Sequence, residues 1–119
     1  MDKKELGRAG EAKAEEILRE KGYRILERSC RTKLGEIDLV AQDGKTLVFV
    51  EVKARSGLSF GLPQEAVHKK KQRHMVRAAL AYIKQKRLGV IPVRFDVVAI
   101  SPEKTEHIPN AFEPSGYTY

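Results

Sequence analysis

Two runs of alternating apolar and polar residues, separated by a turn, constrain the fold of this chain more than any other feature. The runs span residues 35–41 and 46–54, and the segment between them contains Asp43-Gly44. Alternation with a period of two is typical of β-strands, and Asp-Gly between two such runs is a strong hairpin signal. The chain is therefore expected to contain an antiparallel pair of strands at these positions.

The pairing within this hairpin can be counted outwards if the Asp-Gly dipeptide occupies the centre of a two-residue turn. Asp38 then lies opposite Phe49, and Glu36 lies opposite Glu51. One face is uniformly apolar and must pack on the core: Ile37, Leu39, Ala41, Val48, Val50 and Val52. The other face carries its charged residues at the end away from the turn.

The remaining segments give helix and strand signals in a regular order. Helical spacing predicts a first helix over residues 3–21, and strand-forming residues predict a strand over 23–28. A second helix is expected from Pro63 to about Gly89, followed by a strand over 93–100. The tail from about residue 102 contains three prolines and is expected to be irregular, with Ile108 and Phe112 attaching it to the core.

The order αβββαβ predicts a single α/β domain with a mixed central sheet flanked by helices. The strand at 46–54, the second helix and the strand at 93–100 form a right-handed parallel crossover beside the antiparallel hairpin. A chain of 119 residues has the size of one domain.

Composition limits where the protein works. No apolar run approaches the roughly 20 residues that span a bilayer, so no membrane partner is expected. The chain begins with charged residues rather than an apolar signal segment, and Cys30 is its one cysteine. Both features predict a cytoplasmic protein.

The net charge of +7 is concentrated in one part of the chain. Residues 63–88 contain one acid, Glu65, and eight basic residues: Lys69, Lys70, Lys71, Arg73, Arg77, Lys84, Lys86 and Arg87. A concentrated basic stripe suits a polyanion, with nucleic acid as the first candidate and an anionic membrane surface as the second. Charge alone favours a polyanion-binding surface and a merely solubilising helix face equally.

Three carboxylates are expected to gather at the charged end of the hairpin: Glu36, Asp38 and Glu51. Like charges that face one another across strands repel, so the cluster calls for a cation or a raised pKa. Lys53 offsets part of this charge, and a hard divalent ion, Mg²⁺ or Mn²⁺, suits two carboxylates with open positions for water and phosphate. A solvated strand end paired loosely with Lys53 is the alternative.

Two glycines inside the first helix suggest close packing against the sheet. Gly7 and Gly10 each cost on the order of 1 kcal/mol of helix stability relative to alanine. Their smallness would let the helix backbone approach the sheet, with Glu11 at the edge of the contact. Periodicity alone favours Glu11 as one more solvated helix glutamate. Asp96 is an acid in an apolar strand, and pairing with Arg94 is favoured over catalysis.

Several short motifs occur together in one order along the chain. They are Gly10-Glu11, Gly35-Glu36-Ile37-Asp38, the run Phe-Val-Glu-Val-Lys-Ala-Arg at 49–55, Lys71-Gln72, and Arg-Phe-Asp-Val-Val at 94–98. With these motifs the chain resembles the bacterial YraN family of uncharacterised proteins. That family belongs to the PD-(D/E)XK nuclease superfamily, whose restriction-endonuclease-like fold is similar to that of archaeal Holliday-junction resolvases. Ile37 stands where the superfamily name has proline.

The resemblance implies a set of site residues. Glu11, Asp38 and Glu51 would be metal ligands or their close partners, with Asp38 and Glu51 holding Mg²⁺ or Mn²⁺. Lys53 would be the lysine of the Glu-x-Lys motif, and a polar residue from the later helix would be Gln64 or Lys71.

The implied activity is metal-dependent hydrolysis of phosphodiester bonds in DNA, with branched or otherwise structured DNA as a candidate substrate. Phosphates would be gripped by Arg31, Lys33, Arg55, Lys69, Lys70, Lys71, Arg73 and Arg77. A non-catalytic nucleic-acid-binding module of the same fold and a basic-surface interaction adaptor are the alternatives. The sequence does not decide between DNA and RNA as the substrate. It also does not decide whether the protein forms a homodimer, which would suit the cutting of two strands.

Overall fold

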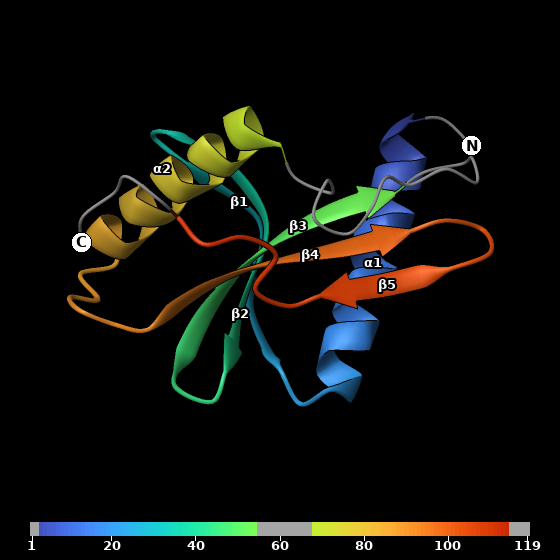
Figure 1. Ribbon diagram of the computed structural model, residues 1–119, viewed down its shortest axis with the longest axis horizontal. Coiled ribbons are helices and arrows are strands. Elements are labelled where there is room, and N and C mark those ends of the chain that lie inside the picture. Colours follow the sequence, from blue (N-terminus) through green and yellow to red (C-terminus); the bar gives the residue numbers. More distant parts are fainter. Residues whose placement is uncertain (1–2, 55–67, 115–119) are drawn as a thin grey trace.

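The structure is a computed structural model that describes residues 3–54 and 68–114 (Figure 1). Its elements, in chain order, are α1 (Lys3–Glu20), β1 (Arg24–Thr32), β2 (Gly35–Asp43), β3 (Thr46–Ala54), α2 (Lys69–Gln85), β4 (Val93–Ile100) and β5 (Thr105–Ile108). The strands form one sheet in the order β1-β2-β3-β4-β5. Only the β3–β4 pair is parallel among these neighbours. The mixed-sheet α/β fold expected from the sequence is confirmed.

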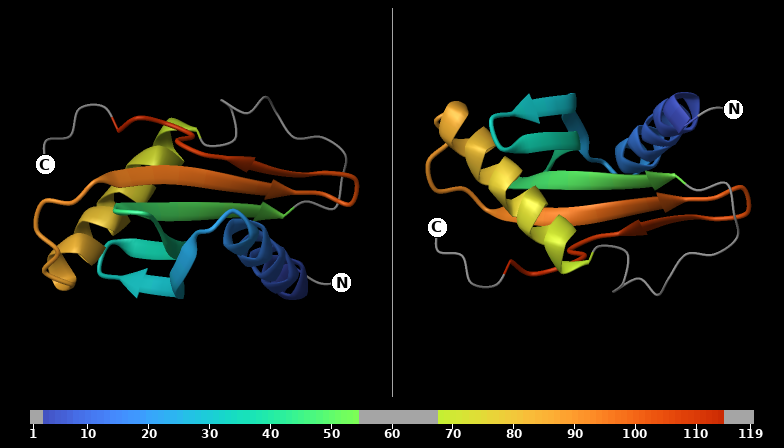
Figure 2. Two further views of the ribbon diagram at one scale, coloured as in Figure 1. Left: turned by 90° about the horizontal axis from the view of Figure 1, so that it is seen from below. Right: turned by 90° about the horizontal axis from the view of Figure 1, so that it is seen from above.

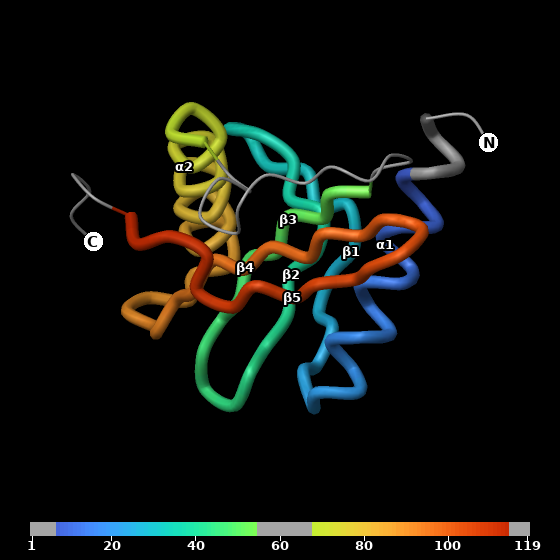
Figure 3. Tube along the Cα trace, turned by 45° about the vertical axis from the view of Figure 1, so that its right-hand side comes forward, coloured from blue at the N-terminus to red at the C-terminus, as the bar shows by residue number. Residues whose placement is uncertain are grey.

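The two helices lie on opposite sides of the sheet (Figure 3). On one side, Ala14 and Leu18 of α1 pack on apolar residues of the sheet: Leu39, Ala41, Val48, Val50 and Val98. On the other side, residues of α2 that include Val76 and Tyr82 pack on Val40, Phe49, Phe95 and Val97. The parallel strands β3 and β4 lie side by side at the centre (Figure 2) and are buried on both faces.

The end of α1 follows from the glycine that the sequence places there. Gly22 has a φ of 90°, a conformation that L side chains rarely adopt. The Gly22 N–H donates to the Arg19 carbonyl at 2.9 Å, and the Tyr23 N–H donates to the Leu18 carbonyl at 3.0 Å. These two bonds form a Schellman cap, which satisfies carbonyls at the end of the helix.

The pairing of the β2–β3 hairpin differs from the prediction by two residues. Asp43 pairs with Thr46, so the central turn residues are Gly44 and Lys45 rather than Asp43 and Gly44. Asp43 stays in the strand, where its Oδ2 accepts a hydrogen bond from Arg94 Nη1 at 3.0 Å. Gly44 takes the left-handed position with a φ of 60°.

Because the pairing shifts by an even number of residues, the side chains stay on the face of the sheet that was expected for them, with one exception. Leu39, Ala41 and Val48 lie together on the α1 side, as predicted. Ile37 was expected with them, but it packs on the α2 side. Counted away from the turn, the last regular β2–β3 pair is Leu39 with Val50, so Ile37 lies beyond the paired part of the hairpin.

Two further expectations about element bounds are corrected. The expected end of the second helix at Gly89 is too late, because α2 stops at Gln85 and Arg87 adopts a φ of 55°. Residues 63–67 lie outside the described residues. β1 runs to Thr32 rather than residue 28, through an irregular register between Ile25 and Glu27.

The tail is not wholly irregular, because residues 105–108 form β5. A turn closed by Ser101 and Lys104 reverses the chain, and β5 pairs antiparallel with β4. Phe112 is buried and stacks on Phe95 with ring centroids 4.9 Å apart. The expected attachment of the tail to the core is confirmed. No helix in the described part of the chain is long and apolar enough to span a membrane.

Candidate functional site

The site forms where β2 and β3 separate. Their regular pairing ends at Leu39 and Val50. Beyond it, Oδ2 of Asp38 accepts a hydrogen bond from the backbone N–H of Val52 at 2.8 Å. A side chain therefore takes over the role of a backbone carbonyl, and the Asp38 carboxyl group is held between the two strands.

Asp38 and Glu51 form a close acid pair. Burial, followed by a hydrogen bond and charge repulsion from Glu51, raises the pKa of Asp38 to about 7. The Val52 N–H and Lys71 act in the opposite direction with smaller effect. Near neutral pH Asp38 is therefore partly protonated, and its protonated form can donate a hydrogen bond to Glu51.

Lys71, in the first turn of α2, reaches across to this pair. Its Nζ lies 2.9 Å from Oε2 of Glu51, whose side chain is 12% exposed. The contact is an ion pair without hydrogen-bond alignment: the oxygen is buried and has no hydrogen-bond partner among the described residues. A buried carboxylate oxygen with unused acceptor capacity is a position where a cation is favoured.

Glu11 joins the acidic cluster from α1. Its pKa is raised by partial burial and by the charges of Asp38 and Glu36. The position of α1 depends on Gly10, since a Cβ on Gly10 would lie 2.7 Å from Cβ of Ala54 at the end of β3. The expected close approach is therefore confirmed at Gly10. It is wrong at Gly7, where a Cβ would meet no described atom within 4 Å.

The structure says less about three other predicted site residues, Lys53, Gln64 and Arg55. Lys53 lies on β3 two residues beyond Glu51, half-buried and paired with Ala99 of β4. Gln64 and Arg55 lie outside the described residues. The structure thus brings together Glu11, Asp38, Glu51 and Lys71, with Lys53 nearby in the same strand.

The residues around the pair fit a small hard cation. A cavity of about 10 Å³, the size of one water molecule, is lined by Glu36, Ile37, Asp38, Phe49, Val50, Glu51 and Met75. Among the described residues, no three acidic, histidine or cysteine side chains converge enough to hold a metal alone. Mg²⁺ typically uses one or two carboxylates and completes its shell with water and phosphate oxygens, which suits Asp38 and Glu51.

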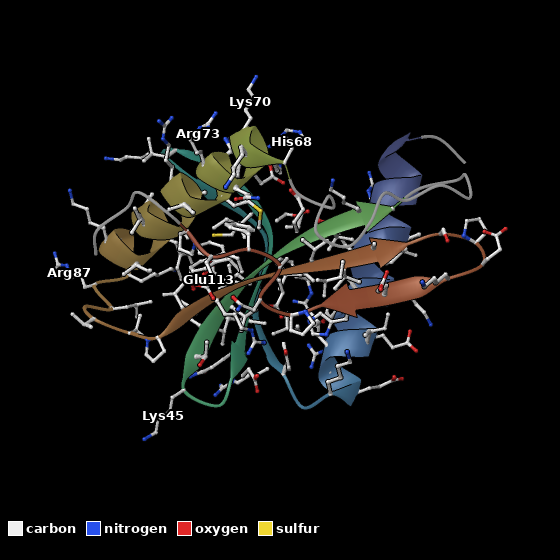
Figure 4. The ribbon with its side chains drawn as sticks, in the orientation of Figure 1. Lys45, His68, Lys70, Arg73, Arg87 and Glu113 are labelled. Atoms are coloured by element: carbon white, nitrogen blue, oxygen red, sulfur yellow. The ribbon has the colours of Figure 1, made fainter. Side chains whose placement is uncertain are left out.

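The exposed face of α2 carries the basic stripe, defined as Lys70, Arg73, Arg77 and Lys84. All are exposed, and their spacing of three, four and seven residues places them on one side of the helix. Figure 4 shows Lys70 and Arg73 projecting away from the sheet, with Lys45 at the opposite end of the molecule.

The other predicted phosphate-binding residues are more scattered. Lys69 is exposed at the start of α2, and Lys33 is exposed at the β1–β2 turn. Arg31 is 89% exposed and lies 3.7 Å from Glu36 in an ion pair. Lys71 was expected on phosphate or in the site, and it pairs with Glu51 in this structure.

A second charged cluster lies on the α1 side of the sheet. Asp96 is fully buried, and its carboxylate accepts hydrogen bonds from Arg94 Nε at 2.9 Å and the Asn110 N–H at 3.0 Å. His107 Nε2 lies 2.8 Å from Asp96 Oδ2. The expected pairing of Asp96 with Arg94 is confirmed. His107 had no signal in the sequence, because its segment was expected to be irregular.

The fold and site together define a mixed-sheet α/β protein with an acid pair between separating strands and a basic helix above it. The sequence profile of the uncharacterised protein family UPF0102 matches residues 10–100. The chain belongs to this family, UPF0102 (YraN).

Relatives from several bacteria match most of the chain. A UPF0102 protein of Caldicellulosiruptor saccharolyticus is 49% identical over 100 residues, which cover 84% of this chain and 85% of the relative. A UPF0102 protein of Syntrophotalea carbinolica is 47% identical over 116 residues, covering 94% of each chain. One from Syntrophus aciditrophicus is 50% identical over 111 residues, covering 90% of this chain and 87% of the relative.

Proposed function

We propose that this protein is a metal-dependent nuclease that hydrolyses phosphodiester bonds of DNA. The observation that carries the proposal is the acid pair of Asp38 and Glu51, with a buried oxygen that lacks a hydrogen-bond partner among the described residues. Structural ion pairs also perturb pKa values, but here the Glu51 oxygen has no hydrogen-bond partner among the described residues besides its ion pair with Lys71, so it retains acceptor capacity for a cation. The basic stripe on α2 supplies the charge that a polyanionic substrate requires.

Asp38 and Glu51 would hold Mg²⁺ or Mn²⁺ through their carboxylate oxygens. When bound, such an ion polarises a phosphoryl oxygen and lowers the pKa of water. The Val52 N–H fixes the direction of the Asp38 carboxylate, so this ligand is already oriented before substrate arrives. Glu11 adds negative potential at the edge of the site and favours cation binding further.

Two lysines have roles in the proposed reaction. Lys53, two residues beyond Glu51, would orient the attacking water or balance the charge that develops on the phosphate. Lys71 pairs with Glu51 in this structure. If Glu51 held a metal ion, the Lys71 ammonium group would be free to pair with a substrate phosphate instead. The basic stripe would grip the backbone on one side of the cleaved bond, without sequence selection.

The test is a cleavage assay with Mg²⁺ or Mn²⁺ on labelled single-stranded, duplex, flap and four-way-junction DNA and on RNA. Wild type is compared with Glu51→Gln and Lys53→Met, and with Glu16→Gln as a control on an exposed carboxylate of α1. Cleavage should be lost in the first two variants and retained in the control. RNA cleavage instead of DNA cleavage would contradict the proposed substrate.

Metal binding is tested separately from cleavage. Mn²⁺ should raise the Tm of the wild type and leave that of an Asp38→Asn, Glu51→Gln variant unchanged, because only the folded wild type offers the site. Equal shifts in both proteins would contradict the metal site. Salt-sensitive DNA binding without metal-induced stabilisation or cleavage would favour a non-catalytic nucleic-acid-binding module instead.

A further inference from the structure

A groove separate from the acid pair lies between the β1–β2 turn and the C-terminal half of α2. Its volume is about 580 Å³, within the range of ligand-binding pockets. The lining residues are Lys33, Leu34, Leu80, Ala81, Lys84, Gln85 and Arg87. Leu80 and Lys84 are nine and thirteen residues beyond Lys71 in α2, so the groove extends from about 14 to about 20 Å along the helix from the lysine that contacts the acid pair.

The groove combines an apolar floor with a cationic rim. Leu34, 54% exposed at the turn, faces the same space as Leu80 and Ala81 of α2. The charged residues among its lining are all basic, and they come from the turn, the helix and the segment after it. An occupant must therefore present apolar surface to the floor and negative charge to the rim.

The floor favours a peptide over a nucleic acid. The lining residues include no aromatic ring, whereas unpaired bases are held chiefly by stacking on aromatic side chains. Aliphatic side chains such as Leu34 and Leu80 instead provide a pocket for an apolar side chain of a protein partner. The surrounding lysines and arginine suit the carboxylates of an acidic segment.

We propose that this groove binds an acidic peptide segment of a partner protein. The segment inserts an apolar side chain between Leu34 and Leu80, and its carboxylates pair with Lys84 and Arg87. Such a site would let the protein be recruited by a partner while the acid pair remains accessible. The proposal does not depend on nuclease activity, since none of these side chains belongs to the acid pair; Lys84 is shared with the basic stripe, whereas Leu34 and Arg87 are not.

The test uses a fluorescein-labelled peptide of about ten residues, made of aspartate and glutamate with two leucines. Leu34→Ser and Lys84→Glu should each weaken its binding by about fivefold or more, since one removes apolar contact and the other removes rim charge. Val90→Ser is the matched control, because Val90 is fully exposed and does not line the groove. A peptide with serine in place of leucine should bind more weakly than the original.

Amide chemical shifts of the full chain give a second measurement. Peptide addition should shift residues 33–34 and 80–87 and leave residues 38 and 51 unchanged. The proposal is overturned if the peptide does not bind at about 1 mM, or if Val90→Ser weakens binding as much as Leu34→Ser. It is also overturned if Leu34→Ser weakens binding of a single-stranded DNA oligonucleotide as much as it weakens binding of the peptide.

Discussion

The side chain of Asp38 closes a gap in the sheet by accepting a hydrogen bond from the backbone N–H of Val52 at 2.8 Å. The ordinary pairing of β2 with β3 stops at Leu39 and Val50, so this bond lies where the strands separate. The separation places the Asp38 and Glu51 carboxyl groups together and leaves access for the Lys71 ammonium. The site is therefore a product of interrupted strand pairing.

Replacing Asp38 with asparagine should stabilise the protein at alkaline pH. The pKa of Asp38 is raised to about 7, so its protonated form is favoured in the folded state. This contribution to stability is complete below about pH 4 and is lost as the pH rises through 7. Asparagine mimics the protonated acid, since it can accept from Val52 and donate to Glu51.

Urea unfolding at pH 4 and pH 8 checks this expectation. Asp38→Asn should exceed the wild type in free energy of unfolding by on the order of 2 kcal/mol at pH 8, with little difference at pH 4. Glu16→Gln, on the exposed side of α1, should show no such pH dependence. An Asp38→Asn effect of the same size at both pH values would mean that ionisation of Asp38 is not costly.

The two glycines of α1 should respond in opposite directions to alanine. Gly7→Ala should stabilise the protein by about 0.5–1 kcal/mol, because the helix gains propensity and a Cβ there meets no described atom within 4 Å. Gly10→Ala should destabilise it by about 1–2 kcal/mol, because its Cβ would lie 2.7 Å from that of Ala54. Thermal or urea unfolding of both variants measures the contrast.

A double substitution tests whether the contact between Gly10 and Ala54 limits the position of α1. Adding Ala54→Gly to Gly10→Ala removes the second Cβ and should recover part of the lost stability, beyond the effect of Ala54→Gly alone. Additive effects of the two substitutions would show that the Gly10–Ala54 approach does not limit the position of α1.

The sequence predicted the order of the main elements and the acid pair because both depend on local patterns. Alternation places charged residues at one end of the hairpin, and glycine marks the end of α1. The turn position was wrong because a contact from Arg94, distant in sequence, holds Asp43 in its strand. The ion pair of Lys71 with Glu51 also depends on how α2 crosses the sheet, which local patterns do not specify.

The strand β5 illustrates the same limit. Its four residues carry weak strand signals between prolines, and its formation depends on pairing with β4. The buried Asp96 selects this arrangement, since it binds both His107 and the Asn110 N–H from the tail. The sequence predicted the pairing of Asp96 with Arg94. It did not predict the contacts of Asp96 with His107 and Asn110, because their segment was expected to be irregular.

Removing the Asp96 carboxylate should therefore destabilise the whole sheet. Burial alone would raise the pKa of Asp96, but hydrogen bonds from His107, Arg94 and the Asn110 N–H hold it below its ordinary value. Asp96→Ala leaves His107 and the Asn110 N–H without this acceptor and leaves Arg94 with Asp43 as its remaining carboxylate partner, so it should cost about 3 kcal/mol in unfolding free energy. Urea unfolding measures it, and the exposed Glu103→Ala serves as the control. A loss no larger than that of the control would contradict this role.

Neutralising three of the four residues of the basic stripe should reduce the salt dependence of the proposed DNA binding. Each phosphate contact contributes about 0.9 to the slope of log affinity against log salt concentration. Lys70→Gln, Arg73→Gln and Arg77→Gln together should lower the slope by about 2 to 3, measured by fluorescence anisotropy with duplex DNA from about 50 to 200 mM salt. All three side chains are exposed on α2, so the variant should fold like the wild type.

The control for this variant carries the same change in net charge at distant positions. Lys13, Lys45 and Lys104 are exposed on α1, the β2–β3 turn and the β4–β5 turn. Their replacement with glutamine should change the slope by less than about 0.5, because long-range charge is screened within about 10 Å at these salt concentrations. Equal losses in both variants would mean that DNA responds to net charge alone, and α2 would then not be the interface.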